Sequence, residues 1–215
     1  MIAQRQIAEL ASLYNIDSFT IFREYLQLSF LNYLCQEAEA SKIYFKGGTA
    51  IHLLFNSPRF SQDLDFSTEY AQGRINELVK KIEKNLVKEL PEFKILPLHQ
   101  GKESVRFKVK FIQLDFKYPF LIQLDFTKKD KPMKKPASSS LVTKFPITFF
   151  PIIIHLQEEE ILAEKIRALL MRAKGRDIFD LWFLLEKEVP LDIDLVNKKL
   201  RKVKSNLTRG NLLRK

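Results

Sequence analysis

The sequence has one cysteine, Cys35, so no disulfide can form within the chain and a reducing cytoplasm is the expected setting. Only 6 of the 215 residues are glycine and 46% are apolar, which argues against a wholly disordered chain. No uninterrupted apolar run reaches the roughly 20 residues that span a bilayer, and no basic segment followed by an apolar one suggests a signal peptide. We therefore expect a folded, cytoplasmic protein.

Several motifs of common enzymes are missing as well. The three histidines have no cysteine or histidine neighbours at metal-ligand spacing, which argues against zinc. The sequence contains no Walker A motif, no G-x-S-x-G and no Cys-His pattern of a thiol enzyme. Zinc enzymes, P-loop NTPases and serine hydrolases thus find no support.

Acidic residues become relatively scarce after residue 70. Residues 1–70 carry 5 basic and 8 acidic side chains, whereas residues 71–215 carry 31 and 18, and the whole chain has a net charge of +10. Such a surplus favours polyanionic partners such as nucleic acid, but a solvated lysine-rich surface gives the same composition. Charge alone does not decide between them.

The spacing of apolar residues predicts an α+β fold. We expect two helices within residues 3–40, further helices over 50–55, 75–90, 158–173 and 177–186, and strands over 42–45, 63–67, 93–98, 105–111 and 120–127. The last two strands are expected to pair antiparallel across the break at Pro119. The pentapeptide IQLDF begins at 112 and again at 122, which predicts two similar strands.

The C-terminal part is expected to form a helical lobe. The polar stretch KKDKPMKKPASSS over 128–140 is the best linker candidate, so we expect domains over 1–140 and 141–215. Gly175 is expected to cap the helix over 158–173, and the next helix to pack through Ile178, Leu181, Trp182 and Leu185. Residues 198–215 hold 8 basic and no acidic residues, typical of a solvated end or a nucleic-acid contact.

The most informative stretch is FKGGTAIHLLFNSPRFSQDLDFS, residues 45–67. In a strand, Asp63 and Asp65 point to the same side, and their carboxylates repel unless a cation lies between them. Mg²⁺ typically takes one or two protein carboxylates together with substrate phosphates. The pair therefore predicts a magnesium site, although an exposed strand face gives the same pattern.

Directly upstream, Gly47, Gly48 and Thr49 open a helix after a strand. Free backbone N–H groups at a helix N-terminus bind phosphate, and glycine lets a phosphate approach closely. An ordinary strand-to-helix turn has the same residues. A phosphate cradle followed by paired carboxylates indicates nucleotide chemistry more strongly than either motif alone.

A third carboxylate would complete a two-metal site for in-line displacement at a phosphate. Asp125 is the better candidate because it shares a strand face with Leu121 and Gln123, opposite the apolar residues of the same strand. Asp115 is the alternative, and either residue could simply end a strand.

In the later helices, Lys165 and Arg172 are seven residues apart and hence share one face, which could grip a triphosphate. A mid-helix lysine is, however, commonly solvated. Arg176 and Asp180 are spaced as a helix-stabilising pair, and Asp177 could be an N-cap.

These residues together resemble the AbiEii/AbiGii family of nucleotidyltransferase-like toxins. Its first motif is matched by Gly48-Thr49 followed by Asp63-Leu64-Asp65. The later motifs are matched by Glu160, Lys165 and Arg172, and by Arg176, Asp177 and Asp180. The three motifs stand in the family's order, and the likeness covers residues 42–186.

The resemblance implies a polymerase-β-type nucleotidyltransferase fold, a mixed sheet flanked by helices with a helical C-terminal lobe. It also implies a Mg²⁺-dependent toxin of a toxin–antitoxin or phage-defence system, paired with an antitoxin and transferring NMP from an NTP to an acceptor. An RNA 3′ end, such as that of tRNA, is the expected acceptor.

The expected residue roles are as follows. Catalytic roles fall to Asp63, Asp65, Asp125 and Asp177, and metal binding to Asp63, Asp65 and Asp125. Nucleotide binding falls to Gly47, Gly48, Thr49, Lys165, Arg172 and Arg176. The alternatives are a non-catalytic protein that binds nucleotide or RNA, and a protein whose acidic strand docks a partner.

Overall fold

The computed structural model describes residues 2–128, 131–145, 151–172 and 174–201, so most of the basic segment over 198–215 lies outside the described residues. The chain divides into two compact units. The first comprises Met1–Lys131 and Ser138–His155, and the second comprises Pro132–Ala137 and Leu156–Lys215. Among the described helices, none has the length and apolar character needed to cross a membrane.

This division differs from a simple boundary at 140. Residues 141–155 go with the first unit because Ile152–His155 forms a strand of its sheet. The segment Pro132–Ala137 goes with the second unit, where the backbone N–H groups of Met133 and Lys134 donate to the carboxylate of Glu160.

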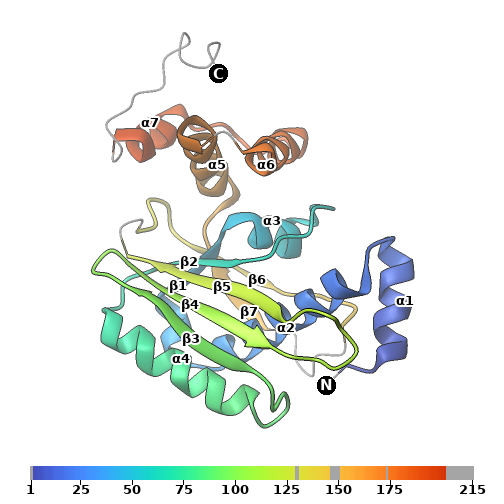
Figure 1. The fold of residues 1–215 in the computed structure, drawn as a ribbon. Helices are drawn as coiled ribbons and strands as arrows, with labels where there is room; N and C mark the ends of the chain where they lie inside the picture. The colour runs from blue at the N-terminus through green and yellow to red at the C-terminus, as the bar shows by residue number, and fades with distance from the viewer. Residues whose placement is uncertain (1, 129–130, 146–150, 173, 202–215) are drawn as a thin grey trace. The chain divides into compact units, whose positions relative to one another are not determined.

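Figure 1 shows the sheet of the first unit, which is mixed, as the family resemblance implies. Within the described residues it has seven strands in the order β3-β4-β5-β2-β1-β7-β6. Neighbours pair antiparallel in β3/β4, β4/β5 and β2/β1, and parallel in β5/β2 and β1/β7. The strands are β1 (Ile43–Lys46), β2 (Leu64–Thr68), β3 (Lys94–Gln100), β4 (Ser104–Phe111), β5 (Phe120–Thr127), β6 (Ala137–Ser140) and β7 (Ile152–His155).

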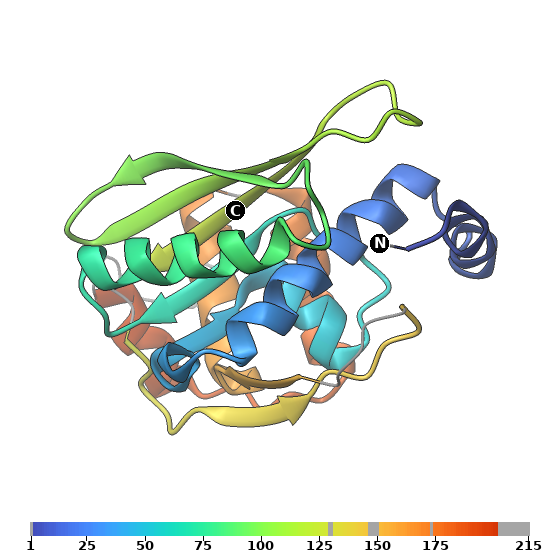
Figure 2. The same cartoon turned by 90° about the horizontal axis from the view of Figure 1, so that it is seen from below.

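Helices cover both faces of this sheet. Helices α2 (Ser18–Cys35) and α4 (Gln72–Leu86) pack on one face, while α3 (Gly47–Phe55) lies on the other, against β1 and β2 (Figures 1 and 2). The predicted apolar stripe of α4 is buried, whereas its lysines lie opposite. Helix α1 (Gln4–Tyr14) packs on α2, and a 3₁₀ helix, η1 (Ala38–Lys42), precedes β1.

Phenylalanine supplies much of the core. Phe66 and Phe126 occupy paired positions on β2 and β5, and their rings stack with centroids 4.9 Å apart. Both are fully buried, and Phe45 of β1 lies 5.4 Å from Phe66. Each buried aromatic side chain stabilises the fold by about 2 to 3 kcal/mol. These inward side chains oblige the alternate residues of β2 and β5, which include the aspartates, to face outward.

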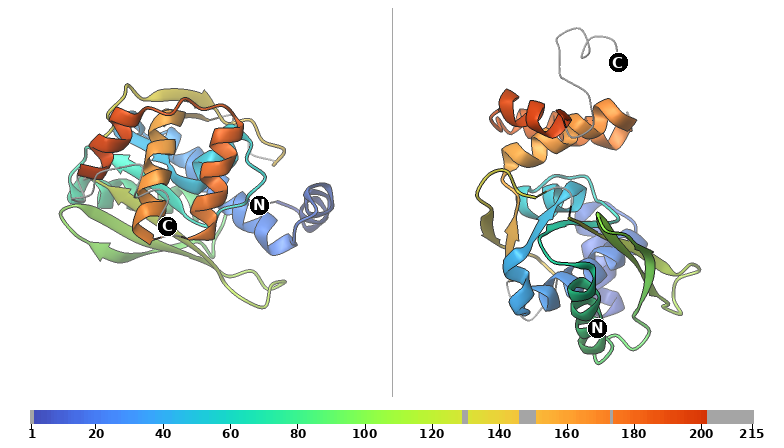
Figure 3. Two further views of the ribbon diagram at one scale, coloured as in Figure 1. Left: turned by 90° about the horizontal axis from the view of Figure 1, so that it is seen from above. Right: turned by 90° about the vertical axis from the view of Figure 1, so that its left-hand side faces the viewer.

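The second unit is helical, as expected. Figure 3 shows α5 (Glu158–Arg172) between α6 (Gly175–Glu186) and α7 (Ile193–Arg201). Two expectations for α6 are wrong. Gly175 does not cap α5 but begins α6, after the N-cap Lys174. The apolar residues Ile178, Trp182 and Leu185 are 54%, 53% and 47% exposed, and the buried residues are Asp177, Asp180 and Leu184. The buried face of this helix thus combines Leu184 with two aspartates that pair with cations of α5.

Two further expectations also differ from the structure. The second IQLDF lies in β5, but the first, at 112–116, lies in the connection between β4 and β5 and is not a strand. The end of the expected linker, Ala137–Ser140, is strand β6. The antiparallel pairing of β4 with β5 is confirmed.

Candidate active site

The phosphate-cradle candidate lies directly against one of the paired aspartates. Gly47 has φ +81°, and a Cβ atom there would overlap Oδ2 of Asp65. Only glycine fits this close approach without strain. No side chain caps the start of α3, whose N-cap residue is Lys46. The N-terminal N–H groups of α3 and the carboxylate of Asp65 therefore border the same place.

The sheet register brings a second aspartate to Asp65. Asp65 and Asp125 are paired residues of the parallel strands β2 and β5 and hence point to the same face. Asp125 also pairs with Arg106 of β4, whose Nε lies 2.8 Å from Oδ2 of Asp125. Oδ1 of Asp125 accepts a hydrogen bond of 3.1 Å from the Thr127 hydroxyl. Asp125 thus stands beside Asp65 with both oxygens engaged.

Asp63 lies just before β2, and neighbouring groups fix it. Its backbone carbonyl accepts from the hydroxyl of Thr49, and its Oδ1 accepts from the backbone N–H of Gln123 at 3.2 Å. The Thr49 side chain therefore positions Asp63. The backbone N–H of Thr49 is the group that remains suited to phosphate.

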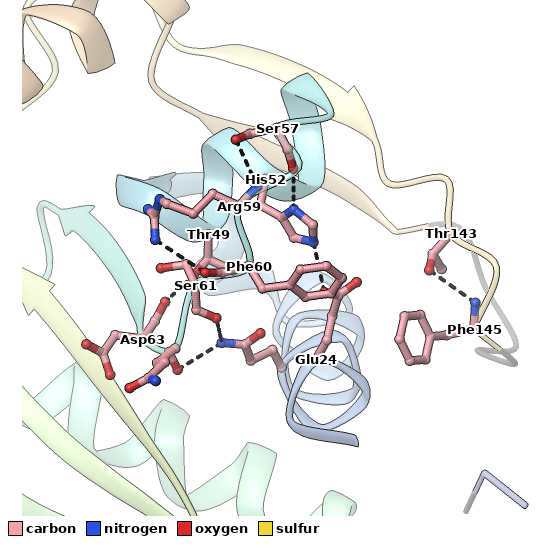
Figure 4. Close-up of polar contacts among 12 residues, drawn as sticks. Glu24, Thr49, His52, Ser57, Arg59, Phe60, Ser61, Asp63, Thr143 and Phe145 are labelled. Atoms are coloured by element: carbon pink, nitrogen blue, oxygen red, sulfur yellow. Dashed lines mark hydrogen bonds and ion pairs between the residues drawn. The ribbon is translucent and has the colours of Figure 1, made fainter. Parts of the chain in front are cut away.

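The loop between α3 and β2 is held from three sides (Figure 4). Nε2 of Gln27 donates to the carbonyls of Ser61 and Gln62 at 3.1 and 2.9 Å. Nδ1 of His52 lies 2.5 Å from the carbonyl oxygen of Ser57. Together with the Thr49 contact, these bonds fix the path of the chain into Asp63.

Sequence reasoning missed Arg59 as a functional candidate. A Cβ atom on Gly48 would overlap Nη2 of Arg59 and lie 2.8 Å from Oγ of Ser61. The guanidinium therefore borders the first turn of α3, where a phosphate would bind. The only available signal was a basic residue four positions before Asp63, which is weak by itself.

The donor set suits Mg²⁺ in part. Asp63 and Asp65 offer hard oxygen ligands beside the candidate phosphate cradle, which would suit an ion that takes one or two carboxylates plus substrate phosphates. In the part of the chain that the structure describes, no three His, Cys, Asp or Glu residues are grouped to hold a metal ion. Asp125 would have to exchange its Arg106 contact to join, and Asp115 lies in the exposed β4–β5 connection.

The second unit places four of the predicted residues in one ion-pair cluster. Nζ of Lys165 lies 2.7 Å from Oδ2 of Asp180 and 3.6 Å from Oδ1 of Asp177. Nε and Nη2 of Arg172 donate to the two oxygens of Asp177 at 2.8 and 2.9 Å. Lys165 and Arg172 thus share a face of α5, as their spacing predicts, and both point at Asp177.

Burial and charge act in opposite directions on Asp177. Its burial would raise the pKa of the carboxyl, but the hydrogen bonds from Arg172 and the charges of Lys165 and Arg172 lower it below the usual value. Asp177 is not an N-cap, because that position is Lys174 and Asp177 lies in the first turn of α6. Arg176 is exposed in the same turn.

Glu160 makes a separate buried cluster. Its carboxylate accepts from the backbone N–H of Met133 at 2.9 Å and lies 2.7 Å from Nζ of Lys199, and both charged side chains are fully buried. Lys199 also reaches Glu164 at 2.9 Å. Burial would lower the pKa of Lys199, but the two glutamates raise it above its usual value. Glu160 therefore ties α5 to α7 and to the segment before β6.

Comparison with known proteins bears on this arrangement. The profile of a family described as nucleotidyl transferase AbiEii toxin, type IV toxin–antitoxin system, matches residues 29–214. No curated protein matches the chain significantly. Among solved structures, the nucleotidyltransferase toxin MenT4 of Mycobacterium tuberculosis H37Rv is similar with a TM-score of 0.65 and 21% identity, over 92% of this chain and 68% of that one. JHP933 of Helicobacter pylori is similar with a TM-score of 0.63 and 23% identity, over 85% of this chain and 74% of that one. These structural likenesses establish the fold.

Proposed function

The chain belongs to the AbiEii family of nucleotidyltransferase toxins of type IV toxin–antitoxin systems, and we propose that it transfers NMP from an NTP to an acceptor hydroxyl with Mg²⁺. The acceptor oxygen forms a bond to the α-phosphorus, and the bond from that phosphorus to the β-phosphate oxygen breaks. Pyrophosphate leaves, and the hydroxyl proton passes to a carboxylate or to water.

One observation carries the proposal. The backbone of Gly47 lies against the carboxylate of Asp65, and Asp65 is the register partner of Asp125. A phosphate bound at the start of α3 would consequently meet acidic side chains, an arrangement that repels phosphate unless a cation intervenes. This is the requirement of a metal-dependent phosphoryl-transfer site, whereas a protein-docking surface has no need of a glycine pressed against an aspartate.

We assign roles in the first unit accordingly. Asp63 and Asp65 would hold Mg²⁺, which supplies charge neutralisation for the phosphates, and Asp125 would assist from the neighbouring strand. The backbone N–H groups of Gly47, Gly48 and Thr49 would bind phosphate oxygens. Thr49 also positions Asp63 through its hydroxyl.

In the second unit, Lys165 is the proposed contact to the triphosphate, with Arg172 and Arg176 as further nucleotide contacts. Asp180 and Asp177 fix the ammonium of Lys165, and Asp177 fixes the guanidinium of Arg172. A cation held in one place loses less conformational freedom on binding a phosphate. Asp177 is thereby proposed as a positioning residue.

The proposed acceptor is an RNA 3′ end, such as that of tRNA, because the basic surplus of the later part of the chain favours a polyanion. A cognate antitoxin and a role in phage defence in the cytoplasm follow from the family as further proposals.

A direct assay tests the function. The purified protein is incubated with each α-labelled NTP and total RNA, with Mg²⁺ or with EDTA, and label transfer is measured. Wild type should label RNA only with Mg²⁺, Asp63→Asn should not label it, and Asp115→Asn should match wild type. Labelling by Asp63→Asn at the wild-type rate would contradict the mechanism. Binding of NTP without any transfer would favour a non-catalytic nucleotide-binding protein.

Growth of a bacterial host tests the toxin role separately. Expression of the wild type should slow growth, and the double variant Asp63→Ala, Asp65→Ala should not. Equal growth of the two cultures would count against toxicity by transfer in that host.

A further inference from the structure

A pocket of about 350 Å³ lies beside the loop that leads into Asp63. The start of α2 lines it on one side and residues 58–62 on the other, and all the lining residues belong to the first unit. Two of the lining side chains, Arg23 and Arg59, are cationic, and no carboxylate is among the described residues that line it. The lining side chains therefore carry a net positive charge, although acidic residues outnumber basic ones in residues 1–70.

Arg23 has an unmet hydrogen-bonding need at this pocket. Its Nε is buried and, among the described residues, has no hydrogen-bond partner. Its guanidinium carbon lies 4.9 Å from the ring centroid of Phe19. Removal from water, the largest effect, lowers the pKa of Arg23, against the opposing charges of Asp17 and Asp63. A partly dehydrated cation with an unpartnered donor is stabilised by an anionic acceptor.

Asp17, one of the two acids whose charges act on Arg23, is already engaged. Its Oδ1 accepts from the backbone N–H of Thr20 and its Oδ2 from the Thr20 hydroxyl, each at 2.8 Å, because Asp17 is the N-cap of α2. Its two oxygens are thus used in starting the helix, so Asp17 does not supply the missing partner for Nε of Arg23.

Arg59 lines the pocket and also reaches the first turn of α3. Its Nη1 donates to the carbonyl of Phe60 at 3.3 Å, while its Nη2 would overlap a Cβ atom placed on Gly48. One guanidinium therefore borders both the pocket and the proposed phosphate cradle. Arg59 could therefore contact a phosphate at either place.

We propose that this pocket binds a phosphate oxyanion through Arg23 and Arg59. The planar guanidinium presents paired donors that match two oxygens of a phosphate. The source of the phosphate rests on the proposed function: it is either a backbone phosphate of a nucleic-acid acceptor or the triphosphate of the NTP. The first source would place the acceptor strand beside Asp63, and the second would extend the nucleotide site.

Binding measurements on the full chain separate these sources. The probes are a 5′-fluorescein oligoribonucleotide with a free 3′-hydroxyl, titrated without NTP, and a fluorescent NTP with Mg²⁺, titrated without RNA. The variants are Arg23→Gln, Arg59→Gln and Arg23→Lys. The matched control is Arg5→Gln, which removes an equal charge from the exposed Arg5–Glu9 pair of α1.

Arg23→Gln and Arg59→Gln should each weaken binding of one probe about 10-fold, as expected for loss of a charge-assisted contact. Arg23→Lys should retain part of the affinity, and Arg5→Gln should change neither probe by more than about 2-fold. Weaker binding of the oligoribonucleotide alone identifies the acceptor backbone as the source of the phosphate. Weaker binding of the NTP identifies the triphosphate as the source.

Unchanged affinity for both probes in both Gln variants would overturn the proposal that this pocket binds phosphate. If Arg23→Gln melts at a lower temperature than wild type, Arg59→Gln still gives the decisive reading, because its guanidinium lies on the loop. The outcomes also separate this inference from the proposed function. If the wild type transfers no nucleotide but Arg23→Gln weakens binding of a probe, the pocket proposal stands and the proposed enzyme activity fails. If the wild type transfers nucleotide and both Gln variants bind both probes with unchanged affinity, the proposed enzyme activity stands and the pocket proposal fails.

Discussion

The ammonium of Lys165 lies 2.7 Å from the carboxylate of Asp180, inside the helical unit. Lys165 is buried, and both Asp180 and its neighbour Asp177 are fully buried. The lysine is therefore not the solvated residue that a mid-helix position commonly holds. Its charge offsets two carboxylates that are excluded from water, so its role in folding must be separated from its proposed role in nucleotide binding.

Lys165→Ala should lower the free energy of unfolding by about 3 kcal/mol, because it leaves buried carboxylates with too little positive charge. Urea denaturation measures the change. The exposed Lys198→Ala is the control and should stay within about 0.5 kcal/mol of wild type. The double variant Lys165→Met, Asp180→Leu should regain much of the loss, since it removes both charges. A Lys165→Ala protein as stable as Lys198→Ala would contradict the ion pair.

Gly47→Ala and Gly73→Ala form a matched pair. At Gly47 the new methyl would overlap Asp65 and the backbone has φ +81°, so we expect a destabilisation of about 2 kcal/mol and loss of NTP binding. At Gly73, in the first turn of α4, the methyl meets nothing within 4 Å, so stability should be unchanged or higher by up to about 1 kcal/mol. Thermal melting and NTP titration check both. Normal NTP binding by Gly47→Ala would count against the phosphate cradle.

The variants Asp125→Asn and Asp115→Asn test which of the two aspartates serves as the third carboxylate of the proposed metal site. Asp125 is the register partner of Asp65, whereas Asp115 lies in the exposed connection and accepts from Gln113 at 3.1 Å. Asp125→Asn should lower transfer activity about 10- to 100-fold, the range found when a supporting partner of a metal site is lost. Asp115→Asn should leave activity unchanged. The reverse order of effects would remove Asp125 from the site.

His52 should make stability depend on pH. Its Nε2 lies 2.8 Å from Oε2 of Glu24 and its Nδ1 lies 2.5 Å from the Ser57 carbonyl, so both ring nitrogens face acceptors when Glu24 is ionised (Figure 4). Burial would lower the pKa of His52, but the hydrogen bond and charge of Glu24 raise it, against the charge of Arg59, and the net pKa is raised. The protonated imidazole is therefore the form that suits the folded protein.

Because the folded pKa is raised above the unfolded value of about 6.5, the stabilisation is complete below that pH. It should be lost as the pH rises through the folded pKa. Unfolding free energies across this range should show the loss in wild type and in the exposed control His99→Gln, but not in His52→Gln or Glu24→Gln. An equal slope in His52→Gln and wild type would show that another group titrates.

The strands, and the strand face on which Asp125 lies, were predictable from the sequence because the same alternation of apolar and polar residues governs both. Alternation along 120–127 places Asp125 opposite Ile122 and Leu124, and the structure has these two residues buried and Asp125 only partly exposed. Periodicity similarly predicts α4 and its buried face. Neither pattern specifies strand order, so the pairing of Asp65 with Asp125 required the structure.

Other features depend on tertiary contacts that no local pattern contains. The pentapeptide IQLDF is a strand at 122, between β4 and β2, and part of a connection at 112, where no strand lies on both sides. In α6 the apolar periodicity pointed to Ile178 and Trp182 as the buried face, but Lys165 and Arg172 hold Asp177 and Asp180 against α5 instead. Counter-charges on a neighbouring helix decided that orientation.

The parallel pairing of β2 with β5 has a kinetic consequence. It joins Asp63 to Gln123 across sixty residues of chain. The intervening helix α4 and the β3/β4 hairpin are held by contacts between residues closer in sequence. Local contacts form in microseconds, whereas joining distant segments must first overcome the entropy of closing a long loop. The carboxylate face should thus be among the last parts of the first unit to assemble, so a chain emerging during synthesis would stay inactive until β5 has docked beside β2.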